Sequence, residues 1–191
     1  MPRLRPVKSR PRNIVGFALI SAEGMIADAN RSFPEAIVND ADHKFFHQGL
    51  DQVQACVHGR HSHEGGPHAK TRARVIVTRQ VETLAPDPAH THTILWNPAG
   101  APFEEAWRAL AIPDGTIAVI GGTEVFGLFL KIGYDAFHLS RSPGRVPGGR
   151  PVFPDVPERT PEQVLMSVGM KPGPARVLDP KAGVSVVTWV R

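Results

Sequence analysis

The chain has 191 residues, of which 41% are apolar and 21% charged, and this size and composition favour one soluble globular domain over a disordered or fibrous protein. Its formal charge of +4 would allow a polyanion as a partner, but its longest apolar run, residues 117–120, is far shorter than the about 20 residues of a membrane helix. The single cysteine, Cys56, excludes an internal disulfide and any site built from several cysteines, so we expect a cytoplasmic protein with no membrane partner.

The positive charge is concentrated in residues 1–12. Five of the 22 Lys and Arg residues precede the first acidic residue, Glu23; without them, 17 basic residues face 18 acidic ones, a net charge of −1. The Pro/Arg-rich composition predicts a disordered tail over 1–12, with no apolar segment typical of a secretion signal. We expect a single folded domain over 13–191 and no nucleic-acid partner, with a polyanion-binding arm as the alternative for the tail.

The folded part begins with a mostly apolar, β-prone run over 14–21, which predicts a strand buried on both faces. Residues 22–24 then predict a turn, residues 25–27 a short apolar return and residues 28–35 an exposed loop. Asn39 or Asp40 is expected to cap a helix that ends at Gly49 or soon after, because Phe45, Phe46 and Leu50 give it an apolar side.

The rest of the chain alternates between predicted strands and helices. Apolar runs predict strands over 53–58, 74–78, 92–96, 116–120 and 134–140, and helical spacing predicts helices over 103–110 and 123–131. A Pro/Gly-rich loop is expected over 142–157, and the runs 163–168 and 184–190 are predicted to pair as a terminal antiparallel hairpin. This alternation implies an α/β domain with a largely parallel sheet.

Three predicted strand ends carry residues suited to binding phosphate. Gly121 and Gly122 stand between a strand and a helix, where the backbone can approach an anion closely. The segment 59–62 follows a second strand with Arg60, His61 and Ser62, and residues 78–79 follow a third. The Rossmann and P-loop fingerprints are absent, so a plain strand–helix turn is the alternative at the glycines. Three such ends suit a dinucleotide with an extra 2′-phosphate.

The order of these motifs resembles the dihydrofolate reductase-like superfamily, and most closely the reductase domain of riboflavin biosynthesis and its stand-alone relatives. The resemblance spans most of residues 13–158 and is carried by IVGFALISAEGMIAD, CVHGRHSHEG, RVIVTR, IAVIGGTEVFGLFL and PVFPD. It implies a three-layer α/β fold. The expected sheet is central, mixed but mainly parallel, with about eight strands, helices on both faces and a C-terminal antiparallel hairpin.

The resemblance further implies an NADPH-dependent reductase that transfers a hydride to a small heterocyclic substrate, either a pteridine or a pyrimidine like the riboflavin precursors. Of the implied cofactor contacts, two would lie near the nicotinamide and the others near the phosphates or the glycine turn. By motif position, these residues are Ala18, Ile26, Gly59, Arg60, His61, Ser62, Thr78, Arg79, Ile120, Gly121, Gly122, Thr123, Glu124 and Val125. A homodimer is the candidate assembly.

Dihydrofolate reductases also place a carboxylate at the start of the first helix, for which Asp40 and Asp42 are the candidates here. The alternative is that Asp40 caps the helix and Asp42 complements its dipole. The substrate loop of dihydrofolate reductases and the tryptophan that precedes the helix in riboflavin reductases are not recognisable. The substrate is therefore open, and a non-catalytic nucleotide-binding or regulatory domain is the alternative function.

Histidines are frequent in the segment after the second long strand, at positions 58, 61, 63 and 68. The pattern H-E-x-x-x-H is one residue longer than the zinc-protease motif, and no carboxylate-rich segment accompanies it. We therefore expect no metal site, and we assign no role to His43, His47, His90 and His92.

Overall fold

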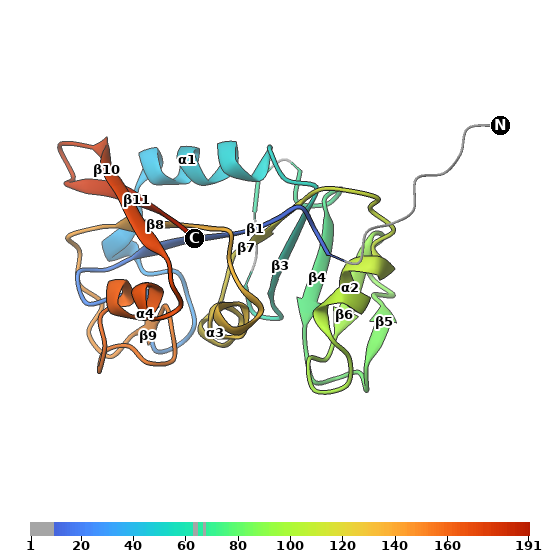
Figure 1. Ribbon diagram of the computed structural model, residues 1–191. Coiled ribbons are helices and arrows are strands. Elements are labelled where there is room, and N and C mark those ends of the chain that lie inside the picture. Colours follow the sequence, from blue (N-terminus) through green and yellow to red (C-terminus); the bar gives the residue numbers. More distant parts are fainter. Residues whose placement is uncertain (1–9, 63–64, 67) are drawn as a thin grey trace.

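A nine-stranded mixed sheet forms the middle layer of the molecule in a computed structural model that describes residues 10–62, 65–66 and 68–191 (Figure 1). The strands of this sheet are β1 (Asn13–Ile20), β3 (Ala55–Gly59), β4 (Ala73–Val77), β5 (Leu84–Pro86), β6 (Thr93–Trp96), β7 (Thr116–Val119), β8 (Ala136–Arg141), β10 (Lys171–Asp179) and β11 (Val184–Val190). A separate two-stranded ribbon consists of β2 (Met25–Ala27) and β9 (Arg150–Pro151). The helices are α1 (Asp40–Leu50), α2 (Phe103–Ala109), α3 (Thr123–Ile132) and α4 (Pro161–Ser167), with a 3-10 turn over Glu35–Ile37.

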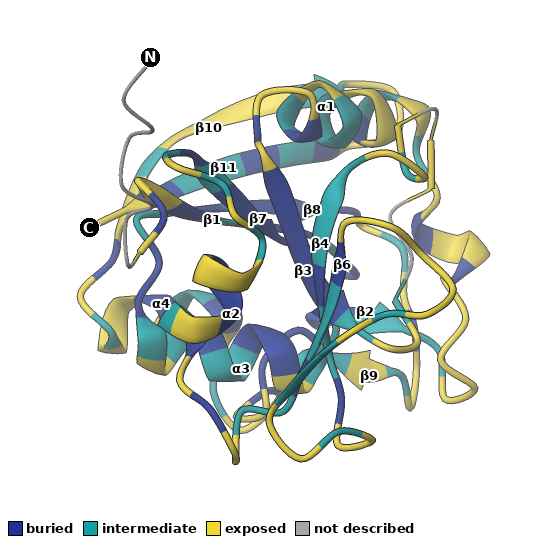
Figure 2. Cartoon of the chain, turned by 90° about the vertical axis from the view of Figure 1, so that its right-hand side faces the viewer, coloured by how far each residue is buried: buried dark blue, intermediate teal, exposed yellow. Residues whose placement is uncertain are grey.

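The strands follow the order β10-β11-β8-β1-β7-β3-β4-β6-β5. The central neighbours β8, β1, β7, β3, β4 and β6 are parallel, whereas β5, β10 and β11 pair antiparallel at the two edges. Helix α1 covers one face, and α2, α3 and α4 lie on the other (Figures 1 and 2). The predicted fold class is thus confirmed, with nine strands where about eight were expected.

The two faces bury different residues. On the α3 face, one large core buries many apolar side chains, among them the aromatic rings of Trp96, Trp107, Phe129 and Phe137. On the α1 face, a smaller cluster is formed by Phe17, Leu50, Val53, Cys56 and Ala118. The central strands are buried on both faces, as the apolar run of β1 predicts (Figure 2).

The prediction of a strand over 163–168 was wrong, because this segment forms α4. Thr160 accepts a hydrogen bond from the Gln163 backbone, Gln163 Oε1 accepts one from Thr160 N–H, and Pro161 opens the helix. This capping box outweighs the β-prone composition of Val164 and Val168. The terminal hairpin is present, but β11 pairs with β10, whose Pro172 and Pro174 a sheet edge tolerates.

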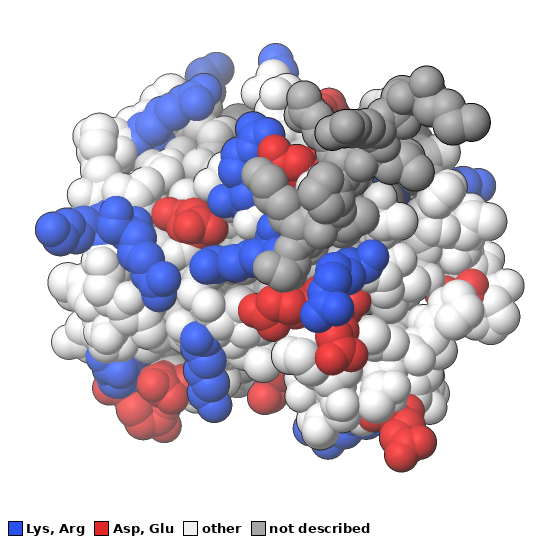
Figure 3. Space-filling view, turned by 45° about the vertical axis from the view of Figure 1, so that its right-hand side comes forward, with Lys and Arg blue, Asp and Glu red and all other residues white. Residues whose placement is uncertain are grey.

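Residues 1–9 of the predicted tail lie outside the described residues, whereas residues 10–12 contact the domain. Arg12 donates its backbone N–H to Gly115 O at 2.6 Å and its guanidinium to Asp114 at 2.5 Å, and Arg10 lies 3.9 Å from Asp135. Basic and acidic side chains are interspersed on the face shown in Figure 3. Within the described part of the chain, no helix has the length and apolarity needed to cross a membrane.

Candidate functional site

The structure brings three predicted strand ends to one edge of the sheet. Gly59, at the end of β3, donates its N–H to the carbonyl of Gly121 after β7, at 2.8 Å. On its other side, Gly59 is in register with Val77 of β4, which leads directly into Thr78. Because β7, β3 and β4 are parallel neighbours, the residues that follow them share this edge.

The Gly121-Gly122 turn leaves open space in front of α3. Gly121 has φ 125°, which glycine adopts readily, and the peptide between the two glycines is cis. A Cβ built on Gly122 would meet only the Ser62 hydroxyl, at 3.7 Å, within the described surroundings. The protein's own packing therefore does not require glycine at 122, and no side chain caps α3. This opening and the N–H groups of a helix start suit an anion.

The side chains that follow the glycines are used by the fold itself. Val125 is buried and lies against Gly59, and the Thr123 hydroxyl donates to the carbonyl of Pro151 in β9. Glu124 is exposed. Within the fold, the side chains of Thr123 and Val125 are thus engaged, whereas that of Glu124 is open to solvent; the role of these residues toward a cofactor stays a prediction.

The basic residues of the predicted site are accessible. Arg60, His61 and Arg79 are exposed and follow β3 or β4, whereas Thr78 is buried and its hydroxyl accepts a hydrogen bond from Gln80 N–H at 3.2 Å. Ser62 is half-buried and donates its backbone N–H to Gly59 O at 3.0 Å. Two exposed arginines therefore follow β3 and β4 at the edge of the sheet that carries the glycine turn.

Three apolar candidates lie on the neighbouring elements. Ala18 is buried in β1, the strand that pairs with β7, and Ile120 is half-buried between β7 and the glycine turn. Ile26 is half-buried in β2, whose partner β9 is bonded to Thr123.

At the start of α1, the structure distinguishes the two candidate carboxylates. Asn39 caps the helix by accepting from the N–H groups of Ala41 and Asp42, each at 3.0 Å, so the cap is not Asp40. Asp40 is exposed, whereas Asp42 is only 8% exposed and faces the sheet. Burial raises the pKa of the Asp42 carboxyl, while a hydrogen bond with Ser140 and the charge of His43 oppose this shift.

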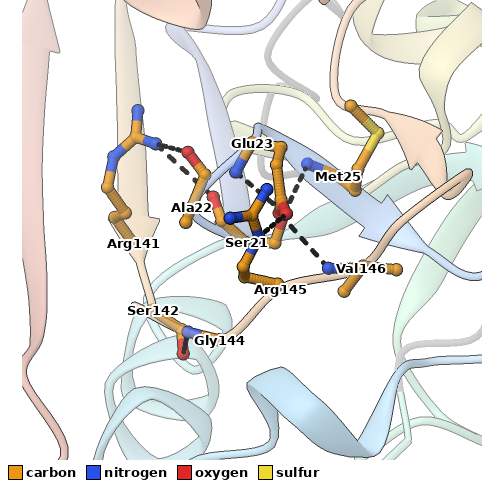
Figure 4. A network of polar contacts seen from close by, with 9 residues as sticks. All are labelled: Ser21, Ala22, Glu23, Met25, Arg141, Ser142, Gly144, Arg145 and Val146. Carbon is orange, nitrogen blue, oxygen red and sulfur yellow. Dashed lines mark hydrogen bonds and ion pairs between the residues drawn. The ribbon is translucent and has the colours of Figure 1, made fainter.

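A polar network fixes the turn between β1 and β2 to the loop after β8 (Figure 4). The Glu23 carboxylate accepts hydrogen bonds from the Ser21 hydroxyl at 2.8 Å, from Arg145 at 2.7 Å and from Val146 N–H at 3.2 Å. The hydrogen bond with Ser21 above all, together with those from Arg145 and Val146 N–H, lowers the pKa of Glu23 to about 2. Arg141 donates to the Ala22 carbonyl at 2.9 Å. The strand end nearest Asp42 is thereby held in place.

A cavity of about 500 Å³ lies at the opposite edge, where β3 and β4 begin. Its wall includes Arg72, which donates to the carbonyls of Leu50 and Val53 and so satisfies the C-terminal end of α1. This cavity shares no residue with the predicted site. The polar residue Arg72 in its wall thus has a structural role, which is to bind the carbonyl groups at the end of α1.

The histidines of the 58–68 segment are spread over different surroundings. His58 is buried in β3 with Nδ1 2.9 Å from Gly59 O, His61 is exposed and His68 lies 4.0 Å from Asp51. His63 lies outside the described residues. Among the residues that the structure describes, no three His, Cys, Asp or Glu side chains group as metal ligands.

The comparisons with known proteins agree with this geometry at the level of fold. No protein-family model and no curated protein matches the sequence. Among solved structures, a diaminohydroxyphosphoribosylaminopyrimidine deaminase/5-amino-6-(5-phosphoribosylamino)uracil reductase from Thermotoga maritima is 17% identical with a TM-score of 0.65. That match covers 97% of this chain and 56% of the other, so the chain spans little more than half of the Thermotoga protein.

Two further structures match over nearly their whole length. A putative riboflavin biosynthesis protein from Shewanella sp. PV-4 is 16% identical with a TM-score of 0.63, covering 94% of this chain and 98% of that one. A dihydrofolate reductase from Enterococcus faecalis, complexed with NADP(H) and RAB-propyl, is 16% identical with a TM-score of 0.63 over 94% and 96% of the two chains. The chain has the dihydrofolate reductase-like fold. The resemblance expected from the motifs is thus confirmed for the fold, and Asp42 and the Gly121 turn lie on one edge of this dihydrofolate reductase-like sheet.

Proposed function

We propose that this chain is an NADPH-dependent reductase that transfers a hydride to a small heterocycle of the pteridine or riboflavin-precursor pyrimidine class. The observation that carries the proposal is that the buried carboxyl group of Asp42 lies close to the Gly121-Gly122 turn. Only β1 separates β8, which bears the Ser140 partner of Asp42, from β7, which leads into Gly121. Two strand spacings amount to about 10 Å, so a cofactor at the Gly121 turn and a heterocycle at Asp42 would lie next to each other.

The residues present fit the proposed cofactor. The open space over Gly122, the Ser62 hydroxyl and the first N–H groups of α3 would hold its pyrophosphate. Arg60 or Arg79 would bind the 2′-phosphate through its guanidinium, and Ala18, Ile26 and Ile120 would border the nicotinamide. When bound, NADPH supplies the hydride, and the protein supplies orientation.

Asp42 is the residue that we propose to handle the proton. A carboxyl group whose pKa is raised by burial retains a proton closer to neutral pH than an exposed one does. Ser140 fixes its orientation, and the carboxyl would bind ring N–H groups of the heterocycle. Keeping a carboxylate buried at this position costs stability, which favours a catalytic over a purely nucleotide-binding role.

Cofactor binding tests the first half of the proposal. Titration of intrinsic fluorescence should show tighter binding of NADPH than of NADH, and Arg60→Ala should weaken NADPH by about tenfold more than NADH, the value of one charge-assisted contact. Arg108→Ala, an exposed arginine on α2, is the matched control and should leave both affinities unchanged. Weak and equal binding of both nucleotides by the wild type would remove the proposal.

Turnover tests the second half. Oxidation of NADPH should be followed across a panel of pterins and ribosylaminopyrimidines, and one class should give turnover that Asp42→Asn reduces. Binding of NADPH without oxidation by any member of the panel would instead favour the non-catalytic alternative.

A further inference from the structure

Two histidines on the outer side of α1 face one another. His43 and His47 stand four residues apart, and residues at this spacing lie on the same side of a helix, one turn apart. Their Nε2 atoms are 3.0 Å from each other. His43 is exposed and His47 is half-buried, so the pair is reached from solvent on the His43 side.

We propose that His43 and His47 form a binding site for a divalent transition-metal ion, such as Zn²⁺, Ni²⁺ or Cu²⁺. Two imidazole nitrogens that each lie about 2.1 Å from one ion are about 3.4 Å apart in a tetrahedral Zn²⁺ site, and about 3.0 Å apart when they meet at a right angle, as at Cu²⁺ or Ni²⁺. The observed Nε2···Nε2 distance, at which the two rings are hydrogen-bonded to each other, has the second value, so we expect Cu²⁺ and Ni²⁺ to fit better than Zn²⁺. The helix therefore presents two nitrogens at the separation that one ion requires, without rearrangement of the backbone.

The orientation of the rings supports a common ligand. The ring centroids are 4.3 Å apart, with 68° between the ring planes. If the two rings met end to end in a straight N–H···N hydrogen bond, their centroids would lie about 5 Å apart. The shorter separation means that the two rings meet at an angle rather than end to end. In the proposed site, one ion would replace the proton shared between the two Nε2 atoms.

The chemistry of the pair determines which ions it would take. Imidazole suits Zn²⁺, Cu²⁺ and Ni²⁺ better than it suits Mg²⁺ or Ca²⁺, and water would complete the coordination. The neighbouring charges on the helix are the Asp42 carboxyl, which interacts with His43, and the exposed Lys44. Since the imidazoles must be neutral to bind, protons compete with the ion.

The site also touches the segment between β3 and β4. A Cβ on Gly66 would lie 2.5 Å from Cε1 of His47, so the Gly66 backbone rests against this ring. An ion that fixes His47 would fix the surface on which Gly66 packs. The two ligands are outside the residues proposed for NADPH and for the proton, and binding of the metal ion is measured without NADPH or substrate, so failure of the metal site and failure of the reductase function are distinguishable.

Calorimetry with the untagged full chain, freed of metal by a chelator, tests the site. Titration with Zn²⁺, and separately with Cu²⁺, should show one ion bound per chain. His43→Gln and His47→Gln should each weaken binding about tenfold or more, because each removes one of two ligands. His90→Gln is the matched control, since His90 is exposed and bonded to Asp87 at 2.9 Å, and should bind as the wild type does.

Electron paramagnetic resonance of the Cu²⁺-loaded chain adds a readout that identifies the ligands. The wild type should show coupling to two equivalent imidazole nitrogens, and each single variant should show one. Circular dichroism should confirm that both variants remain folded, since neither histidine is fully buried. Equal affinity of the wild type and both variants, or two-nitrogen coupling that survives in either variant, would overturn the proposal.

Discussion

The two faces of the sheet differ in what they bury. The α3 face packs large aromatic rings, with Phe129 5.0 Å from Phe103 and 6.2 Å from Tyr134 between ring centroids. The α1 face buries fewer apolar side chains and instead holds Asp42, Ser140 and the half-buried His138. This difference indicates that one face supplies most of the apolar stabilisation. The other face can therefore carry polar groups that reduce stability, among them Asp42, to which we assign the proton.

The largest effect on stability is expected on the α3 face. Phe129→Ala removes a fully buried ring and should lower the free energy of unfolding by about 3–5 kcal/mol, through lost burial and the cavity left behind. Phe46→Ala, a half-buried ring on the α1 face, is the comparison and should cost clearly less. Urea denaturation measures both, and equal costs would contradict the division between the faces.

Asp42→Asn should separate activity from stability. We expect turnover to fall about 100-fold or more, because the proton-handling group is lost. Burial raises the pKa of Asp42, so the wild type loses stability as pH rises from the unfolded-state pKa of about 3.9 through the higher folded value. The variant should therefore be at least as stable as the wild type at pH 7, and this advantage should disappear in acid.

The matched control for that experiment is Asp40→Asn on the same helix turn. Asp40 is exposed, so neither turnover nor the pH dependence of unfolding should change. A loss of turnover in Asp40→Asn that equals the loss in Asp42→Asn would transfer the proposed role to the outer carboxylate.

A smaller effect is expected at His138. Its ring stacks on Phe17 at 4.7 Å, its Nδ1 lies 2.9 Å from the Thr188 hydroxyl, and burial lowers its pKa. As pH falls through about 6.5, the unfolded chain takes up a proton that the folded chain does not, so stability falls. In urea denaturation at pH 7 and pH 5, the free energy of unfolding of His138→Asn should therefore fall less between the two pH values than that of the wild type. His92→Asn, which replaces an exposed histidine, is the control and should lose as much as the wild type does.

The sequence was sufficient for features that depend on local patterns. The apolar run of β1 predicted a central strand, and Asn39 or Asp40 predicted the start of α1, where Asn39 is the cap. Residues 163–168 were misjudged because their β-prone composition was given more weight than the capping box at Thr160 and Gln163. β10 could not be found from composition, since Pro172 and Pro174 are tolerated only because the sheet places this strand at its edge.

To choose between Asp40 and Asp42, one must know which side of α1 is buried against the sheet. Two residues apart, these carboxylates point to nearly opposite sides of a helix with 3.6 residues per turn. Asp42 is four residues before Phe46, and this spacing could have placed it on the apolar side. The same spacing relates His43 to His47, to which the sequence analysis gave no role. In contrast, the distance from Gly59 to Gly121 depends on strand order, which no local pattern contains.

The position of β1 has a consequence for how the chain is made. β1 ends at residue 20, but the strands on its two sides begin only at residues 116 and 136. At about 5–20 residues per second, a ribosome leaves this apolar segment without either neighbour for several seconds or longer. A buried strand in the interior of the sheet is thus the one that waits longest for its partners, and the nascent chain will be most prone to aggregate during that interval.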